Sequence, residues 1–157
     1  MNNKYINFYN NLVKLTRNKK LYNEYSVEDK FSERLIILLF HFAFFLNIFK
    51  SYDDKNVLQE IFDCFFKQIE LSLREMGFGD PSVNKKMKSY ISIFYSILNE
   101  IDLWDTKNQE KQSQVISQYM KLNEKTLLLV KYFTNYRKFL KNSTLNSLLK
   151  GVVNSDF

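Results

Sequence analysis

Residues that could carry out covalent chemistry are scarce in this chain, which contains one histidine, His41, and one cysteine, Cys64. A Ser-His-Asp or Cys-His arrangement would have to take its base from His41, yet both residues lie inside strongly apolar runs. A zinc site needs more His and Cys ligands than one of each, and the turn GFGD lacks the Lys and Ser of a phosphate-binding loop. We therefore expect no enzyme, and we interpret His41 as a core residue, not a haem ligand, and Cys64 as a small buried hydrophobe.

Carboxylates also occur at helical spacing, since Asp63 and Glu70 are one heptad apart and Glu60 is near. Di-iron helical bundles hold their metals with similar carboxylates, but they also use Glu-x-x-His ligands, which this sequence lacks. Glu70 and Arg74 are four residues apart, which favours an ion pair along a helix. We expect no metal and no cofactor.

Basic residues are concentrated at both ends of the chain, whose formal net charge is +6. Residues 1–25 contain five basic residues and one acidic residue, residues 26–106 contain nine and thirteen, and residues 107–157 contain nine and three. This asymmetry favours an anionic partner, either nucleic acid or a membrane surface, although moderate positive charge also serves solubility.

Two groups of basic residues are candidates for binding such a partner. The first group, Lys85, Lys86 and Lys88, follows a turn at residues 77–80. The second group alternates with aromatic residues, which would suit a phosphate backbone with stacked bases but equally describes an amphipathic helix with a solvated face. Its members are Lys131, Arg137, Lys138 and Lys141, with Tyr132, Tyr136 and Phe139 between them.

The turn contains Gly77, Gly79 and Asp80, for which a structural and a functional explanation are both open. In the structural explanation, Gly77 is the left-handed residue that ends one helix and Asp80 is the N-cap of the next. In the functional explanation, a rigid turn displayed between two long helices binds a partner together with the first group of lysines.

Helical periodicity predicts an all-α fold, a single-domain bundle of about six or seven helices over residues 1–157. The chain has only three glycines and one proline to interrupt helices, and it shows no sustained strand alternation. The expected helices cover residues 3–17, 26–50 with a cap at Ser26, 53–76, 80–104, 109–122 and 124–141, and a final turn covers 145–150. A polar break separates the first two helices, Asp53 and Asp54 cap the third, and the buried stripe of the third helix ends at Met76.

The uncharged run at residues 35–49 would make about 22 Å of helix, which is shorter than the roughly 30 Å hydrocarbon layer of a bilayer. We interpret it as the central buried helix of the bundle. The N-terminus lacks the apolar core of a signal peptide and the Arg and Ser enrichment of a transit peptide, so we expect a cytoplasmic protein.

One stretch, residues 58–95, resembles the ubiquinol-cytochrome c chaperone family, the assembly factors of the cytochrome bc1 complex. The resemblance depends on FDCFF, LREMGFGD and VNKKMK, which occur in that order and at family-like spacing. The run LLFHFAFFL and the lead-in LYNEY are similar to the segments that precede them in the family. The family-like core, of bacterial type, covers about residues 5–104, and the resemblance is looser over the helices at 109–150.

This resemblance implies a helical assembly chaperone that binds newly made cytochrome b, and in mitochondria also the ribosome. It implies no catalysis and no small-molecule substrate. A bacterial member would be cytoplasmic or peripheral on the cytoplasmic face of the inner membrane, where basic residues would meet a ribosome or an anionic membrane surface. The alternative prediction is a basic helical module that binds nucleic acid.

Overall fold

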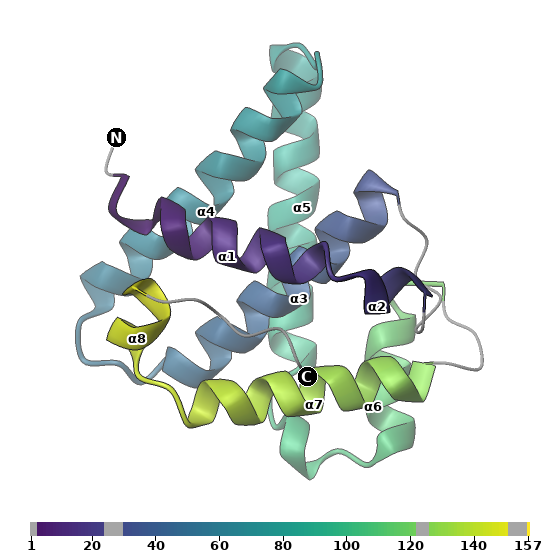
Figure 1. Cartoon of the computed structure of the whole chain (residues 1–157). Helices are drawn as coiled ribbons and strands as arrows, with labels where there is room; N and C mark the ends of the chain where they lie inside the picture. The colour runs from purple at the N-terminus through teal and green to yellow at the C-terminus, as the bar shows by residue number, and fades with distance from the viewer. Residues whose placement is uncertain (1–2, 24–29, 122–125, 151–156) are drawn as a thin grey trace.

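The computed structural model describes residues 3–23, 30–121, 126–150 and 157, and these parts form a bundle of α-helices without a β-strand (Figure 1). The predicted all-α bundle is confirmed. Two short 3-10 helices, Asn3–Tyr5 and Trp104–Thr106, precede α1 and α6. The α-helices are α1 (Ile6–Thr16), α2 (Lys19–Asn23), α3 (Phe31–Phe49), α4 (Lys55–Glu75), α5 (Asp80–Glu100), α6 (Gln109–Ser117), α7 (Thr126–Lys141) and α8 (Leu145–Lys150).

Helix α3 forms the centre of the bundle, as its apolar run predicts, and α1, α5 and α7 all contact it. Phe42 is fully buried, and its ring stacks on Phe65 of α4 and Phe94 of α5 with centroids 3.9 and 5.3 Å apart. Within the described ranges α3 is the one helix long and apolar enough to cross a membrane, yet 61% of its most apolar window is buried in the protein. Such burial is typical of a core helix. The cap predicted at Ser26 lies outside the described residues.

Helices α4 and α5 form a hairpin whose tip extends beyond the other helices (Figure 1). Helix α4 begins at the predicted cap, because the Asp54 carboxylate accepts hydrogen bonds from two backbone N–H groups of the first turn. It ends as predicted at Gly77, whose φ of 96° lies in the left-handed region. The N–H of Phe78 then bonds to the carbonyl of Leu73, which completes a Schellman motif.

Two predictions at this tip are wrong. Asp80 is not an N-cap: Gly79 holds the cap position, and Asp80 is the first residue of α5 with its carboxylate paired to the Arg74 guanidinium across the turn. Met76 was expected in the buried stripe of α4, but 52% of its surface is exposed because the helix extends past the bundle here.

The remaining helices differ from the prediction in their bounds. Helix α2 occupies a segment expected to be a polar break, and α6 ends at Ser117 instead of continuing to residue 122. The predicted start of the next helix at residue 124 lies outside the described residues, and α7 and α8 otherwise have the predicted bounds. Helix α6 packs on α7, and α8 packs on α1.

Candidate functional site

His41 lies in the core, as predicted, and both nitrogens of its ring are occupied. Nδ1 lies 2.7 Å from the carbonyl oxygen of Ile37, and Nε2 lies 2.7 Å from the hydroxyl of Tyr132. A carbonyl oxygen only accepts hydrogen bonds, so Nδ1 carries the proton and Nε2 accepts the proton of Tyr132. The hydroxyl of Tyr136 donates to the backbone carbonyl of His41 at 3.0 Å. No lone pair of this ring points to a substrate or a metal.

Electrostatics agree with that assignment. Burial lowers the pKa of His41 to about 4, so the ring is neutral at physiological pH. The other candidate, Cys64, was expected to be buried but is only half-buried. Desolvation raises the pKa of its thiol. A protonated thiol is a poor nucleophile. Neither residue has the environment of a catalytic group.

The carboxylates of α4 have structural partners. Glu70 forms the predicted ion pair with Arg74, at 3.3 Å, and a second pair with Lys67, at 2.8 Å. Glu60 accepts a hydrogen bond from the Tyr5 hydroxyl at 3.1 Å, and Asp63 accepts one from Gln59 at 2.9 Å. Across the described part of the chain, no group of three or more His, Cys, Asp or Glu side chains could hold a metal ion.

The first group of lysines lies on α5 next to the hairpin tip. Lys85 and Lys88 are exposed, whereas Lys86 is half-buried with its ammonium 4.7 Å from the centre of the Phe78 ring. The turn beside them is rigid, since Gly77 closes the Schellman motif and Asp80 is held by Arg74. The structure thus brings the predicted tip residues together at one end of the molecule.

Of the two explanations open for the second basic group, the structure does not provide the stacking surface. Tyr132 and Tyr136 are buried against the core and cannot stack on bases. The Arg137 guanidinium donates to the Asn47 side-chain oxygen at 2.7 Å and pairs with Asp105, which also pairs with Lys141. Arg137 and Lys141 therefore tie α7 to the turn after α5, and only the exposed Lys131 and Lys138 keep the predicted position on a solvated face.

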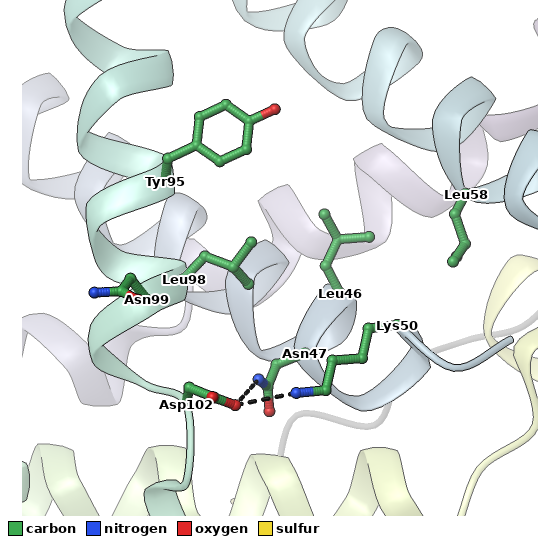
Figure 2. A pocket seen from close by; sticks show the side chains of 8 residues that line it. All are labelled: Leu46, Asn47, Lys50, Leu58, Tyr95, Leu98, Asn99 and Asp102. Carbon is green, nitrogen blue, oxygen red and sulfur yellow. Dashed lines mark hydrogen bonds and ion pairs between the residues drawn. The ribbon is translucent and has the colours of Figure 1, made fainter.

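A feature that the sequence did not predict is an open groove of about 480 Å³ between α5 and α4, with the C-terminal end of α3 as its floor (Figure 2). Its position follows from the hairpin, whose two helices diverge away from the tip (Figure 1). The lining residues are Leu46, Asn47, Lys50, Leu58, Tyr95, Leu98, Asn99 and Asp102.

The walls of the groove are apolar and one end is charged. The Tyr95 ring stands at one edge with 53% of its surface exposed, and leucines line the space below it (Figure 2). At the charged end the Asp102 carboxylate pairs with Lys50 at 3.1 Å and accepts a hydrogen bond from Asn47 at 3.2 Å. Lys50 first, and then Asn47, lower the pKa of Asp102.

Leu103, which directly follows Asp102, is unusual in two respects. Its φ of 57° lies in the left-handed region, which is unfavourable for leucine, and 65% of its surface is exposed. Tyr95 and Leu103 are thus exposed large apolar residues at or beside the groove. For Tyr95 a signal exists in the sequence, because this apolar residue lies outside the buried stripe of its helix.

In contrast to the apolar groove, a polar cleft of about 410 Å³ lies beside α1 and the last residue of α8. Amide and cationic side chains dominate it, and it brings together the basic N-terminal and C-terminal parts of the chain, which lie far apart in the sequence. The cleft is lined by Asn7, Asn10, Asn11, Val13, Lys14, Arg17 and Lys150.

Comparisons with known proteins agree with this architecture. A family model described as ubiquinol-cytochrome C chaperone matches residues 23–155, a range that includes α6 to α8, where the resemblance found in the sequence is loose. The crystal structure of the Cbp3 homolog from Brucella abortus has a similar fold, with a TM-score of 0.77 and 23% identity over 97% of this chain and 90% of that chain. A search of curated protein sequences gave no match.

Proposed function

This chain belongs to the ubiquinol-cytochrome c chaperone family, and we propose that it is an assembly chaperone of the respiratory cytochrome bc1 complex that binds newly made cytochrome b. The observation that carries the proposal is the groove of Figure 2. A protein of this class must hold an apolar client without reacting with it. The groove offers exposed apolar surface, while His41 and Cys64 lack the environment for catalysis.

The groove suits a helical client because it lies between two helices over a third. An apolar helix can lay one face into such a groove and leave its other side outside. Tyr95 is the expected anchor, since exposed tyrosines that become buried often dominate binding energy. Cytochrome b, the membrane subunit that the family's chaperones bind, supplies apolar helices of this kind.

An anionic partner is the second part of the proposal. The cleft beside α1 contains Lys14, Arg17 and Lys150 together with three asparagine amides, and all of these side chains can donate hydrogen bonds to phosphate. A ribosome or an anionic membrane surface would supply such phosphates, and either would keep the protein at the cytoplasmic face of the inner membrane. A free-standing nucleic-acid-binding module is less well supported, because Tyr132 and Tyr136 are buried.

The proposal is tested by deleting the gene and restoring it with variants. Deletion should lower assembled bc1 complex, measured from the spectra of its b-type haems, and leave other respiratory complexes near normal. The wild-type gene should restore the complex. Tyr95→Ala should recover cytochrome b at least about tenfold less well in mild-detergent pull-downs.

The matched control is Leu127→Ala on α7, because Leu127 is as exposed as Tyr95, at 52% against 53%, but does not line the groove. This variant should behave as wild type in both measurements. Unchanged bc1 levels in the deletion strain would contradict the chaperone function. Equal loss in both variants would contradict the groove as the client site.

A further inference from the structure

The charges of the α4–α5 hairpin are unevenly distributed along its length. The segments that build the groove, residues 46–63 and 95–106, contain seven acidic and two basic residues. The segment that connects them through the tip, residues 64–94, contains five basic and three acidic residues. These two segments are therefore acidic in a protein whose net charge is +6, and the next residue, Lys107, donates to the backbone carbonyl of Asp102 at 2.7 Å and not to its carboxylate.

Several of these acidic residues have structural roles, and others are available to a partner. Asp54 caps α4, Glu60 bonds to Tyr5, and Asp105 is paired with α7. Asp102 lines the groove itself, and 49% of its side chain is exposed although it pairs with Lys50. Asp53 is exposed on the loop that leads from Lys50 to α4.

Lys50 is the one cation among the residues that line the groove, and Asp102 neutralises it. With 64% of its side chain exposed, Lys50 can move away from this ion pair at little cost, because ion pairs between solvent-exposed side chains are weak. A client cation can then take its place beside Asp102. The groove thus combines apolar walls with a carboxylate end that can accept positive charge.

We propose that the groove binds the end of an apolar helix that is followed by Lys or Arg, which is the chemistry of the cytoplasmic end of a transmembrane helix. This inference rests on the proposed function and adds which part of the client is recognised. Loops on the cytoplasmic side of membrane proteins carry an excess of Lys and Arg next to their apolar segments. Such an end places its apolar turns against Tyr95 and Leu98 and its cations beside Asp102 and Asp53. Ends without cations gain only the apolar contact.

The test measures binding of two synthetic peptides to the full chain by fluorescence anisotropy. Both peptides contain about three turns of apolar helix, and they differ only in their ends, which carry lysines in one and serines in the other. The lysine peptide should bind roughly tenfold more tightly at low salt. The difference should disappear near 1 M salt, where the Debye length is about 3 Å.

Two matched double variants locate the effect on the hairpin. Asp53→Asn with Asp102→Asn should remove most of the preference for lysine, whereas Glu75→Gln with Asp80→Asn, at the tip, should retain it. Tyr95→Ala should weaken binding of both peptides, since both use the apolar wall.

The outcomes separate this inference from the proposed function. A lysine preference that the groove variant loses and the tip variant keeps supports the inference. Equal binding of the two peptides, weakened for both by Tyr95→Ala, overturns the recognition of cations and leaves the client groove in place. A lysine preference unaffected by the groove variant overturns the placement at Asp102. Failure of both peptides to bind overturns the groove as a client site and the inference with it.

Discussion

His41 is a residue of α3 and the groove has the end of α3 as its floor, and the two sites differ in how far their side chains are covered by partners. At His41 the polar groups are matched: one ring nitrogen donates to a backbone carbonyl and the other accepts from Tyr132. At the groove a large apolar group stays partly exposed, since 53% of the Tyr95 surface faces solvent although its ring contacts Phe62 and Phe94. A buried polar residue with satisfied hydrogen bonds stabilises a fold, whereas exposed apolar surface indicates binding. In this molecule the single histidine is a structural residue, and the surface proposed to bind the client is made of leucines and a tyrosine.

The largest expected effect on stability comes from truncating Phe42, a core residue next to His41, and it is compared with truncating Tyr95 in the groove. Phe42→Ala should lower the free energy of unfolding by about 3–5 kcal/mol, because its ring is fully buried between Phe65 and Phe94. Tyr95→Ala should change it by less than about 0.5 kcal/mol, because the residue is half exposed. Urea unfolding of both variants measures the difference. A Tyr95→Ala loss as large as that of Phe42→Ala would mean that the groove is part of the core.

His41 should make stability depend on pH. Burial holds its pKa at about 4 in the folded protein against an ordinary 6.5, so between these values the unfolded chain binds a proton that the folded chain does not. The free energy of unfolding should therefore fall by about 3 kcal/mol as the pH is lowered from 6.5 to 4. Unfolding of wild type across this range measures it.

His41→Leu is the control for that pH dependence. At pH 7 it should cost about 1–3 kcal/mol, because the Tyr132 hydroxyl loses its acceptor. Its stability should then fall less steeply with acid, so the gap to wild type closes towards pH 4. Cytochrome b recovery should not change, and the purified protein should be colourless with or without the substitution. Parallel pH curves would show that His41 does not set the dependence.

Substituting the two glycines of the hairpin tip should have smaller effects on stability, and the effects should differ between the two positions. Gly77→Ala should cost about 1 kcal/mol, since its φ of 96° is unfavourable for any residue with a Cβ. Gly79→Ala should be close to neutral, because a Cβ there meets no atom within 4 Å and the backbone is extended. Thermal unfolding of the two variants is sufficient to compare them. If the amount of cytochrome b or ribosomes recovered falls in Gly79→Ala without a loss of stability, the turn takes part in binding a partner.

The smallest effect on stability, within about 0.5 kcal/mol, is expected for charge reversal on the exposed lysines of α5. Lys85→Glu with Lys88→Glu changes exposed side chains in the second and third turns of α5, so no core contact is lost. Lys86 is left unchanged because it lies over Phe78. The variant should keep wild-type helicity and lose binding to ribosomes or anionic vesicles. Loss of binding instead in Lys131→Glu with Lys138→Glu would assign the anionic partner to α7.

Much of the fold was predictable because its determinants are local. Helix periodicity identified α3, α4, α5 and α7, and Asp54 and Gly77 were identified as caps from residue type and position alone. The Glu70–Arg74 pair follows from a spacing of four residues. A cap or an i, i+4 pair involves residues within about one turn of each other, so the chain specifies it before any tertiary contact forms.

The sequence by itself determined an all-helical bundle with α3 at its centre, and the tertiary structure decided which surfaces are open. The groove needs side chains from residues 46 to 102, and it exists because α4 and α5 diverge over the end of α3. Arg137 was predicted as part of a binding face, but its partner is Asn47, 90 residues away. Asp80 was predicted as a cap but pairs with Arg74. Each of these depends on the directions in which packed helices cross, which residue spacing within one helix does not encode.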